Sequence, residues 1–478
     1  MITSHPVALG NVFNPPPPSN KSFQVSRDCS LLKFSDHIHL EGCARGHLNS
    51  TVRWLLDVKG AMLKKTISLI ALLLVITCAA LPAGRRIFWN PKERPRRPLA
   101  QAIQIADEAQ NLNDVPPKND KTFSDAESLD TWLDSVRRQH NLPAMGAIVF
   151  RADSVLARGI AGVRRANAPD LVELSDRFQL GSNTKAITAT VVATLVEEGK
   201  LKWTTTLAEV FPDLRDSMDV GFRGVTMDLL LSHHAGISPF KDTDDRDFKS
   251  IPRLTGTPTQ RRALFTAWVL RGKPAGPIAA KGVYSNGGYT IAAAVVERLT
   301  GESWESLVRK RVFGPLELSG TFAWSYSADP NQPWGHYEIR GAMKPIDPRN
   351  RDERVPPIIW PAGAVELSLN DYARFLQINL RGLQGRDTPL LKSATIKHLH
   401  TSPVSPADNY GLGWGVQDFD GAPASVHTGS AGAFYAVTII QPTRDLGVAV
   451  FTNAGGERAT AAANDAVKAL IRRFAKSG

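Results

Sequence analysis

The amino-acid sequence predicts an α+β domain in which helices pack on the faces of an antiparallel sheet. Two observations support this prediction. An amphipathic helix that begins near Ser124 is followed directly by two strand-like runs with a turn between them, and two more apolar runs flank the turn "QPTRDLG" near the C-terminus. A helix followed by a hairpin fits an antiparallel layer better than repeated parallel βαβ units, and no internal repeat is apparent.

The first helix is predicted from a cap and a periodicity. Ser124 and Glu127 have the spacing of a capping box. Apolar residues then recur at helical spacing, at Leu129, Trp132, Leu133 and Val136. The runs "MGAIVF" (145–150) and "SVLARGIAG" (154–162) that follow are typical of strands.

Composition bounds the function classes. The chain has 478 residues, of which 42% are hydrophobic and 22% charged, so it has room for a large core and is not disordered throughout. The net charge is +11. Because the basic residues are scattered and form no compact block with aromatic residues, no nucleic-acid partner is predicted.

The first 123 residues are predicted to lie outside the folded domain. Residues 1–61 have poor periodicity and a Pro15–Pro18 run, and we interpret them as a non-native or disordered extension, with Met62 as the true start. Residues 62–84, "MLKKTISLIALLLVITCAALPAG", have the order of charge, apolar core and small residues that is typical of a secretory signal. The apolar run is shorter than the roughly twenty residues that span a bilayer, and a single membrane anchor is the alternative.

Residues 85–123 form a Pro-rich and polar linker that contains "WNPKERPRRP", and the folded domain is assigned to 124–478. No cysteine follows Cys78. An exported domain without disulfides fits a bacterial envelope, either periplasmic or membrane-anchored, and depends on its core for stability.

The first candidate for chemistry is "GSNTK" at 181–185. An apolar helical pattern with one apolar face follows it and ends at Gly199, which places Ser182 in the first turn of a helix. Residues three apart share a helix face, so the Lys185 amine reaches the Ser182 hydroxyl. Burial and the positive end of the helix dipole both favour the neutral amine that a general base requires. The alternative is that Ser182 and Lys185 are only a polar helix start without a catalytic role, since Ser-x-x-Lys also occurs by chance at 30–33.

The second candidate is Tyr284-Ser285-Asn286, a polar loop before a helix predicted from about Tyr289 to Leu299. A tyrosine hydroxyl relays a proton to a leaving group, and an asparagine amide holds a substrate carbonyl and a lysine together. The alternative is a turn with a half-buried tyrosine.

The third candidate is His427-Thr428-Gly429, which is predicted to open an edge strand. A basic residue and a hydroxyl there can bind a carboxylate or carbonyl, while the glycine lets a substrate approach the backbone. A bulge in a sheet is the alternative.

The three motifs in this order resemble those of the serine β-lactamase and penicillin-binding protein superfamily, in its class C type. Supporting phrases span most of the folded domain: "LLLSHHAGI" (229–237), "SWESLVRKRVFGPLELSGT" (303–321), "PAGAVELSLNDYARFLQ" (361–377) and "YGLGWGV" (410–416). The resemblance implies a β-lactamase/transpeptidase-like fold: an antiparallel sheet flanked by helices, a mostly helical region, and the active site in the cleft between them.

The resemblance also implies roles for the motif residues. Ser182 would be the acylated nucleophile, Lys185 its base and Tyr284 the proton shuttle. The substrate would be held by the other motif residues, Asn286, His427, Thr428, Gly429 and Ser430. The backbone N–H groups of Ser182 and Ser430 would form the oxyanion hole. No cofactor and no metal are implied, and the partner would be a small-molecule or peptidoglycan-derived substrate.

One departure decides the branch. Class C β-lactamases carry Lys-Thr-Gly at the third motif, whereas this chain carries His-Thr-Gly. The resemblance therefore favours an exported serine hydrolase of the D-alanyl-D-alanine carboxypeptidase branch. A class C β-lactamase or a family VIII type esterase is the alternative within the superfamily. A noncatalytic β-lactam sensor or peptidoglycan-binding module is the alternative outside catalysis.

Two other enzyme classes fit poorly. The nearest approach to the Gly-x-Ser-x-Gly elbow of α/β-hydrolases is "TGSAG" at 428–432, where threonine replaces the first glycine. The pairs His233-His234 and His398 with His400 lack carboxylate or cysteine partners at metal-ligand spacing, so no metal hydrolase is predicted.

Overall fold

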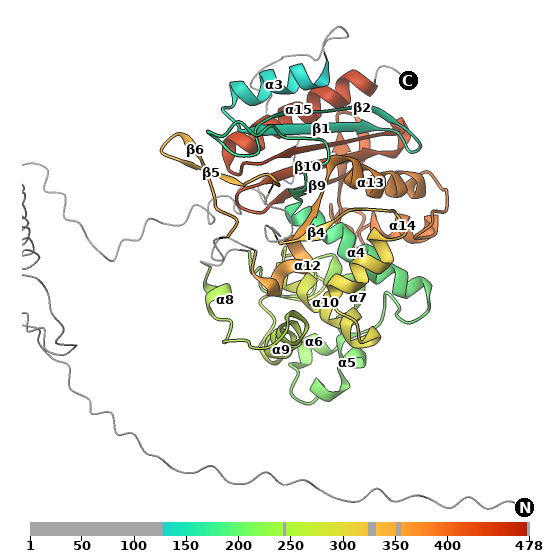
Figure 1. Ribbon diagram of the computed structural model, residues 1–478. Coiled ribbons are helices and arrows are strands. Elements are labelled where there is room, and N and C mark those ends of the chain that lie inside the picture. Colours follow the sequence, from blue (N-terminus) through green and yellow to red (C-terminus); the bar gives the residue numbers. More distant parts are fainter. Residues whose placement is uncertain (1–127, 242–244, 324–330, 350–354, 476–478) are drawn as a thin grey trace, which may run out of the picture. The chain divides into compact units, whose positions relative to one another are not determined.

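Figure 1 shows the computed structural model of the protein, which describes residues 128–475 apart from 242–244, 324–330 and 350–354. The predicted extension (1–61), export segment (62–84) and linker (85–123) lie outside the described residues and stay predictions. So does the predicted capping box of Ser124 and Glu127. Within the described part of the chain, no helix is both long and apolar enough to cross a membrane.

A six-stranded sheet organises the domain, and its strands follow the order β2-β1-β11-β10-β9-β8 with every pair antiparallel. The strands are β1 (Ala144–Phe150), β2 (Val155–Gly162), β8 (Gly415–Phe419), β9 (Ala422–Ser430), β10 (Tyr435–Gln441) and β11 (Leu446–Thr452). The N-terminal hairpin and the C-terminal hairpin around "QPTRDLG" are both confirmed. The pairing of β1 with β11 joins them into one sheet.

Two helices, α3 (Leu129–Gln139) and α15 (Glu457–Ala475), cover one face of the sheet (Figure 1). Alternate β1 residues, among them Ala147 and Val149, face this layer, whereas Ile148 faces the other. The four apolar residues predicted for the first helix are all buried. The helix begins at Leu129, and the Ser128 hydroxyl caps it by accepting a hydrogen bond from the Thr131 N–H.

The opposite face is covered by α13 (Leu369–Leu383), and the buried residues of α4 (Thr184–Glu197) belong to the same hydrophobic core. The sequence predicted a single apolar face for α4, but Thr184–Leu195 is buried without interruption. The prediction was too narrow because α4 contacts several helices of the helical region as well as the turn beside the sheet, so its small Ala and Thr side chains are enclosed too. Gly199 follows the helix with φ +70°, as expected of a C-terminal glycine.

A helical region extends from α4 away from the sheet (Figure 1). Its helices are α5 (Leu207–Val210), η2 (Pro212–Leu214), α6 (Val220–Arg223), α7 (Met227–Leu231), α8 (Arg246–Lys249), α9 (Pro258–Arg271), α10 (Asn286–Thr300), α11 (Trp304–Val308), η3 (Arg309–Phe313), η5 (Pro357–Ile359) and α12 (Trp360–Gly363). The remaining elements are η1 (Gly181–Asn183), α14 (Ser393–Leu399), η6 (Pro442–Arg444) and the short strands β3 (Phe178–Gln179), β4 (Thr321–Phe322), β5 (His336–Ile339), β6 (Ala342–Pro345) and β7 (Val365–Leu367).

A buried ion-pair cluster ties three of these helices together. Arg262 of α9 is completely buried and donates to the carboxylates of Glu297 on α10 and Glu305 on α11. Glu297 also accepts a hydrogen bond of 2.8 Å from the Trp304 N–H. The cluster fixes α10, and the N-terminus of α10 carries the Tyr-Ser-Asn motif.

Candidate active site

Ser182 lies in η1, a single 3₁₀ turn that leads directly into α4. The sequence had placed it in the first turn of the helix, and it lies just before that turn. Lys185 occupies the first turn of α4, so the three-residue spacing brings its Nζ atom within 3.0 Å of Ser182 Oγ. Ser182 is partly exposed, whereas Lys185 is completely buried. A buried amine therefore contacts a hydroxyl that a substrate can reach.

Burial favours the neutral form of Lys185, and its contacts are compatible with that form. Its Nζ atom lies 2.8 Å from Asn286 Oδ1 and 3.0 Å from the Ala362 carbonyl oxygen, both of which are acceptors. A neutral amine has two N–H donors for these acceptors and one lone pair for the Ser182 hydroxyl. Burial lowers the pKa of Lys185 well below its usual value. Lys185 thus meets both requirements of a general base, position and protonation state.

Tyr284 approaches Ser182 from the helical region. Its phenol lies close enough to the Ser182 side chain to interact with it, and its ring centre lies 4.5 Å from Lys185 Nζ. Burial raises the pKa of the Tyr284 phenol well above its usual value. The tyrosine is therefore a protonated hydroxyl in contact with the nucleophile, as a proton relay requires.

Asn286 is the first residue of α10, and the Ser285 side chain caps that helix by accepting from the Gly288 N–H at 3.1 Å. The predicted start near Tyr289 was three residues late. Two glycines, which favour helices poorly, follow Asn286, and Gly287 packs closely against Phe240. The correction matters because it places Asn286 at the rigid start of a helix.

The His-Thr-Gly motif lies at the end of β9, not at its start. The prediction of an edge strand holds only for this end: β9 pairs with β10 as far as Ser430, whereas its pairing with β8 reaches only Val426. Residues 427–430 of β9 thus run past the last β8 pair, alongside η1.

Two glycines bring this strand end against the nucleophile turn. A Cβ atom on Gly429 would lie 2.0 Å from the Leu180 carbonyl oxygen and 2.9 Å from the Ser182 backbone nitrogen. A Cβ atom on Gly181, whose φ is +52°, would lie 2.6 Å from the Ser430 backbone nitrogen. The amides of Ser182 and Ser430 therefore lie at one junction that only glycine can form, and two such N–H groups can stabilise an oxyanion.

His427 is buried within hydrogen-bonded contacts. Its Nδ1 atom donates to the Thr428 carbonyl oxygen at 2.7 Å, and its Nε2 atom lies 3.0 Å from the Tyr410 hydroxyl. Burial, assisted by the nearby Lys185, lowers the pKa of His427 to about 3. The imidazole is neutral at ordinary pH and offers no positive charge to a substrate carboxylate.

Sequence reasoning did not assign His233 to the site. Its ring centre lies 4.3 Å from that of Tyr284 and 4.6 Å from that of Tyr410, and its Nδ1 atom accepts a hydrogen bond from the Ser285 N–H. The segment "LLLSHHAGI" (229–237), which resembles the family's sequences, was the signal that could have identified His233. His234, which adjoins it, bonds instead to the Ser232 carbonyl oxygen. Within the described ranges, no cluster of His, Cys, Asp and Glu side chains could hold a metal.

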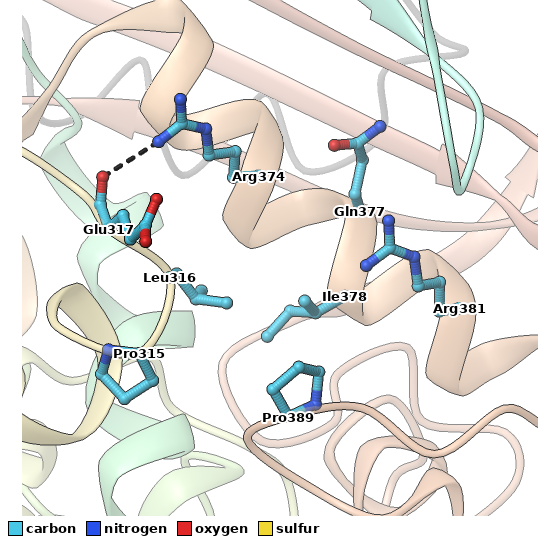
Figure 2. A pocket seen from close by; sticks show the side chains of 8 residues that line it. All are labelled: Pro315, Leu316, Glu317, Arg374, Gln377, Ile378, Arg381 and Pro389. Atoms are coloured by element: carbon cyan, nitrogen blue, oxygen red, sulfur yellow. Dashed lines mark hydrogen bonds between the residues drawn. The ribbon is translucent and has the colours of Figure 1, made fainter.

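A separate surface pocket lies between α13 and the loop before β4 (Figure 2). Arg374, Gln377 and Arg381 of α13 line one side of it, and 315–317 line the other. Arg374 donates to the Glu317 carbonyl oxygen at 2.9 Å, and Arg381 pairs with Asp153. None of the motif residues lines this pocket.

Comparison with known proteins agrees with this geometry. The family model described as Beta-lactamase matches residues 122–472. Penicillin-binding protein 4 of Amycolatopsis lactamdurans is 28% identical over 340 residues, 68% of this chain and 84% of that protein. Unguisins hydrolase ungD of Aspergillus violaceofuscus is 26% identical over 70% of this chain and 62% of its own length. The octameric penicillin-binding protein homologue from Pyrococcus abyssi aligns with a TM-score of 0.59 and 21% identity, covering 71% of this chain and 76% of that one.

Proposed function

This chain is a serine hydrolase that belongs to the beta-lactamase family, and we propose that it is an exported peptide hydrolase of the D-alanyl-D-alanine carboxypeptidase type. The observation that carries the proposal is the 3.0 Å contact between Ser182 Oγ and the buried Lys185 amine. The phenol of Tyr284 interacts with the same serine and would carry the proton to the leaving group.

Acylation would proceed in two steps. Ser182 Oγ attacks the carbonyl carbon of the scissile amide while Lys185 takes the hydroxyl proton, and the N–H groups of Ser182 and Ser430 stabilise the oxyanion. As the C–N bond breaks, Tyr284 donates its proton to the leaving amine and is reprotonated from Lys185. An acyl ester on Ser182 and a free amine are the products of this half-reaction.

Deacylation would use the same groups in reverse. A water molecule takes the place of the leaving amine and gives a proton to the Tyr284 and Lys185 pair as its oxygen attacks the ester. The ester bond breaks, Ser182 recovers its proton, and the carboxylic acid leaves. The neutral state of Lys185 is restored, so one set of residues serves both half-reactions.

The peptidase branch is supported by the third motif and by one relative. The third motif is His-Thr-Gly, whereas class C β-lactamases carry Lys-Thr-Gly, and the buried, neutral His427 does not replace the charge of that lysine. The relative with 28% identity carries the name penicillin-binding protein. Export is supported by the sequence of residues 62–84, which leaves open whether the segment is cleaved or anchors the chain.

The test is a time course of intact mass after the purified protein is mixed with benzylpenicillin, with the Ser182→Ala variant in parallel. We expect an adduct only when Ser182 is present, and its persistence would favour a penicillin-binding peptidase. Rapid decay of the adduct would instead identify a β-lactamase. If no adduct forms while a small activated ester still acylates Ser182, the peptidase proposal is wrong and an esterase is favoured.

A further inference from the structure

His233, which follows α7, contacts the chain on both sides of Tyr284. Its carbonyl oxygen accepts a hydrogen bond of 2.8 Å from the Val283 N–H. Its Nδ1 atom accepts one of 3.1 Å from the Ser285 N–H. The ring centres of His233 and Tyr284 are 4.3 Å apart. One residue therefore holds the tyrosine through both of its chain neighbours and through its ring.

The conformation and protonation of His233 are both unusual. Its φ is +70°, in the left-handed region that few residues other than glycine occupy. Because Nδ1 is an acceptor, the ring hydrogen is on Nε2, which is buried and has no hydrogen-bond partner among the described residues. An uncommon φ and an unpaired buried N–H both cost free energy, and such costs are typical of residues that serve a function.

The surroundings of the His233 ring keep it neutral and in place. Burial lowers the pKa of His233 well below its ordinary value, and the nearby Lys185 contributes in the same direction. The ring centre of Tyr410 lies 4.6 Å from that of His233, and the Tyr410 hydroxyl lies 3.0 Å from His427 Nε2. The imidazole thus contacts the tyrosine of the second motif and a residue that is bonded to the third motif.

The position of the Tyr284 hydroxyl decides whether it can pass a proton to a leaving group. Part of Tyr284 is exposed, so the core does not fix its ring by itself. We propose that His233 is a positioning residue, which holds the Tyr284 hydroxyl where it protonates the leaving group during acylation of Ser182. This role rests on the proposed function, in which Tyr284 is the proton donor and is reprotonated from Lys185. His233 itself transfers no proton.

The experiment compares two esters with the same acyl group, an N-acyl-D-alanine methyl ester and the matching p-nitrophenyl ester. The methoxide must gain a proton as it leaves, whereas nitrophenolate departs without one. In His233→Ala, kcat/KM for the methyl ester should fall by about tenfold or more, and kcat/KM for the p-nitrophenyl ester by no more than about twofold. The ratio of the two values does not depend on the folded fraction, so a loss of stability alone cannot change it.

Two further variants separate positioning from general damage to the site. Tyr284→Phe removes the donor itself and should lower the same ratio. If His233 acts through the tyrosine, adding His233→Ala to Tyr284→Phe should not lower the ratio further. His233→Asn should restore part of the ratio lost in His233→Ala, because asparagine tolerates a positive φ and its Oδ1 atom can accept a hydrogen bond from the Ser285 N–H.

His336→Ala is the matched control. His336 is also a buried histidine, and its Nε2 atom accepts a hydrogen bond of 2.9 Å from the Ala166 backbone N–H. The control variant should lose stability and keep the wild-type ratio. An equal effect of His233→Ala on both esters, or a further fall in the ratio when it is added to Tyr284→Phe, would overturn the inference and indicate a structural role.

The two proposals fail differently. If neither ester acylates Ser182 in the wild-type protein, the proposed function is refuted together with the role of His233 that rests on it. A ratio that falls in Tyr284→Phe but stays at the wild-type value in His233→Ala would refute the role of His233 alone.

Discussion

Lys185 Nζ lies 2.8 Å from Asn286 Oδ1, although the two residues are 101 positions apart in the sequence. This contact joins the first turn of α4 to the first residue of α10. Asn286 also donates to the Phe240 carbonyl oxygen, which fixes the orientation of its amide. The amide oxygen therefore faces the lysine, and the Lys185 lone pair is left for Ser182.

Replacement of Lys185 by methionine tests its role as the base. Met has a similar length and no amine, so the variant should keep the fold while the rate of Ser182 acylation falls by about 10²- to 10⁴-fold. Because an amine is costly to bury, the free energy of unfolding, measured by urea titration, should not decrease greatly. A variant that folds normally and is acylated at the wild-type rate would contradict the assignment.

The pH dependence of acylation follows from two shifted pKa values. Lys185 acts as a base only when neutral, so the rate rises as the pH rises through its folded-state pKa, which burial places well below 10.5. Tyr284 must be protonated, and its raised pKa keeps it so over the same range. We expect an ascending limb well below 10.5 and no descending limb near neutrality. The acylation rate constant from about pH 5 to about pH 10 checks this, and a midpoint at the ordinary lysine pKa would contradict it.

Gly429→Ala tests the junction between β9 and η1. The added methyl group would lie 2.0 Å from the Leu180 carbonyl oxygen, so the strand end or the nucleophile turn must move. We expect a loss of about 1–3 kcal/mol in the free energy of unfolding. Acylation should fall by at least about 10²-fold, because the Ser182 and Ser430 N–H groups lose their alignment.

Gly224→Ala is the control for this change, since a Cβ atom there would meet nothing within 4 Å and the backbone φ is −92°. It should alter neither stability nor acylation appreciably. If Ser182 of Gly429→Ala is acylated at the wild-type rate, the junction does not form the oxyanion hole.

Much of this architecture could be predicted because its signals are local. The hairpin of β1 and β2 follows from two adjacent apolar runs, and the contact of Ser182 with Lys185 follows from their spacing on one turn. By contrast, His233 and Lys241 reach Tyr284 only through tertiary packing of separate loops. No periodicity in the sequence marks such residues.

The errors of prediction have the same origin. A motif shows which residue types are present but not how each is solvated. His427 illustrates this, since its sequence context suggested a basic group while its buried contacts hold it neutral. The start of α10 was missed because Gly287 and Gly288 argue against helix locally, whereas packing against Phe240 requires a residue without a side chain there.

The buried cluster around Arg262 provides a test of stability that is separate from the chemistry. Arg262→Met leaves the Glu297 carboxylate, which is 5% exposed, without its main cation. Among the described residues, the Trp304 N–H and the Thr259 hydroxyl remain as its donors. Removing one partner of a buried pair typically costs about 3–5 kcal/mol. Urea unfolding monitored by circular dichroism should show a loss of that size.

The double variant Arg262→Met with Glu297→Gln separates charge from packing. It removes both members of the closest pair, so it should recover part of the stability lost in Arg262→Met. In the fraction of either variant that remains folded, α10 still presents Asn286 to Lys185. This fraction should therefore still be acylated at Ser182 at low temperature. A loss below about 1 kcal/mol in Arg262→Met would mean that water reaches Glu297 and that the cluster does not hold the helical region together.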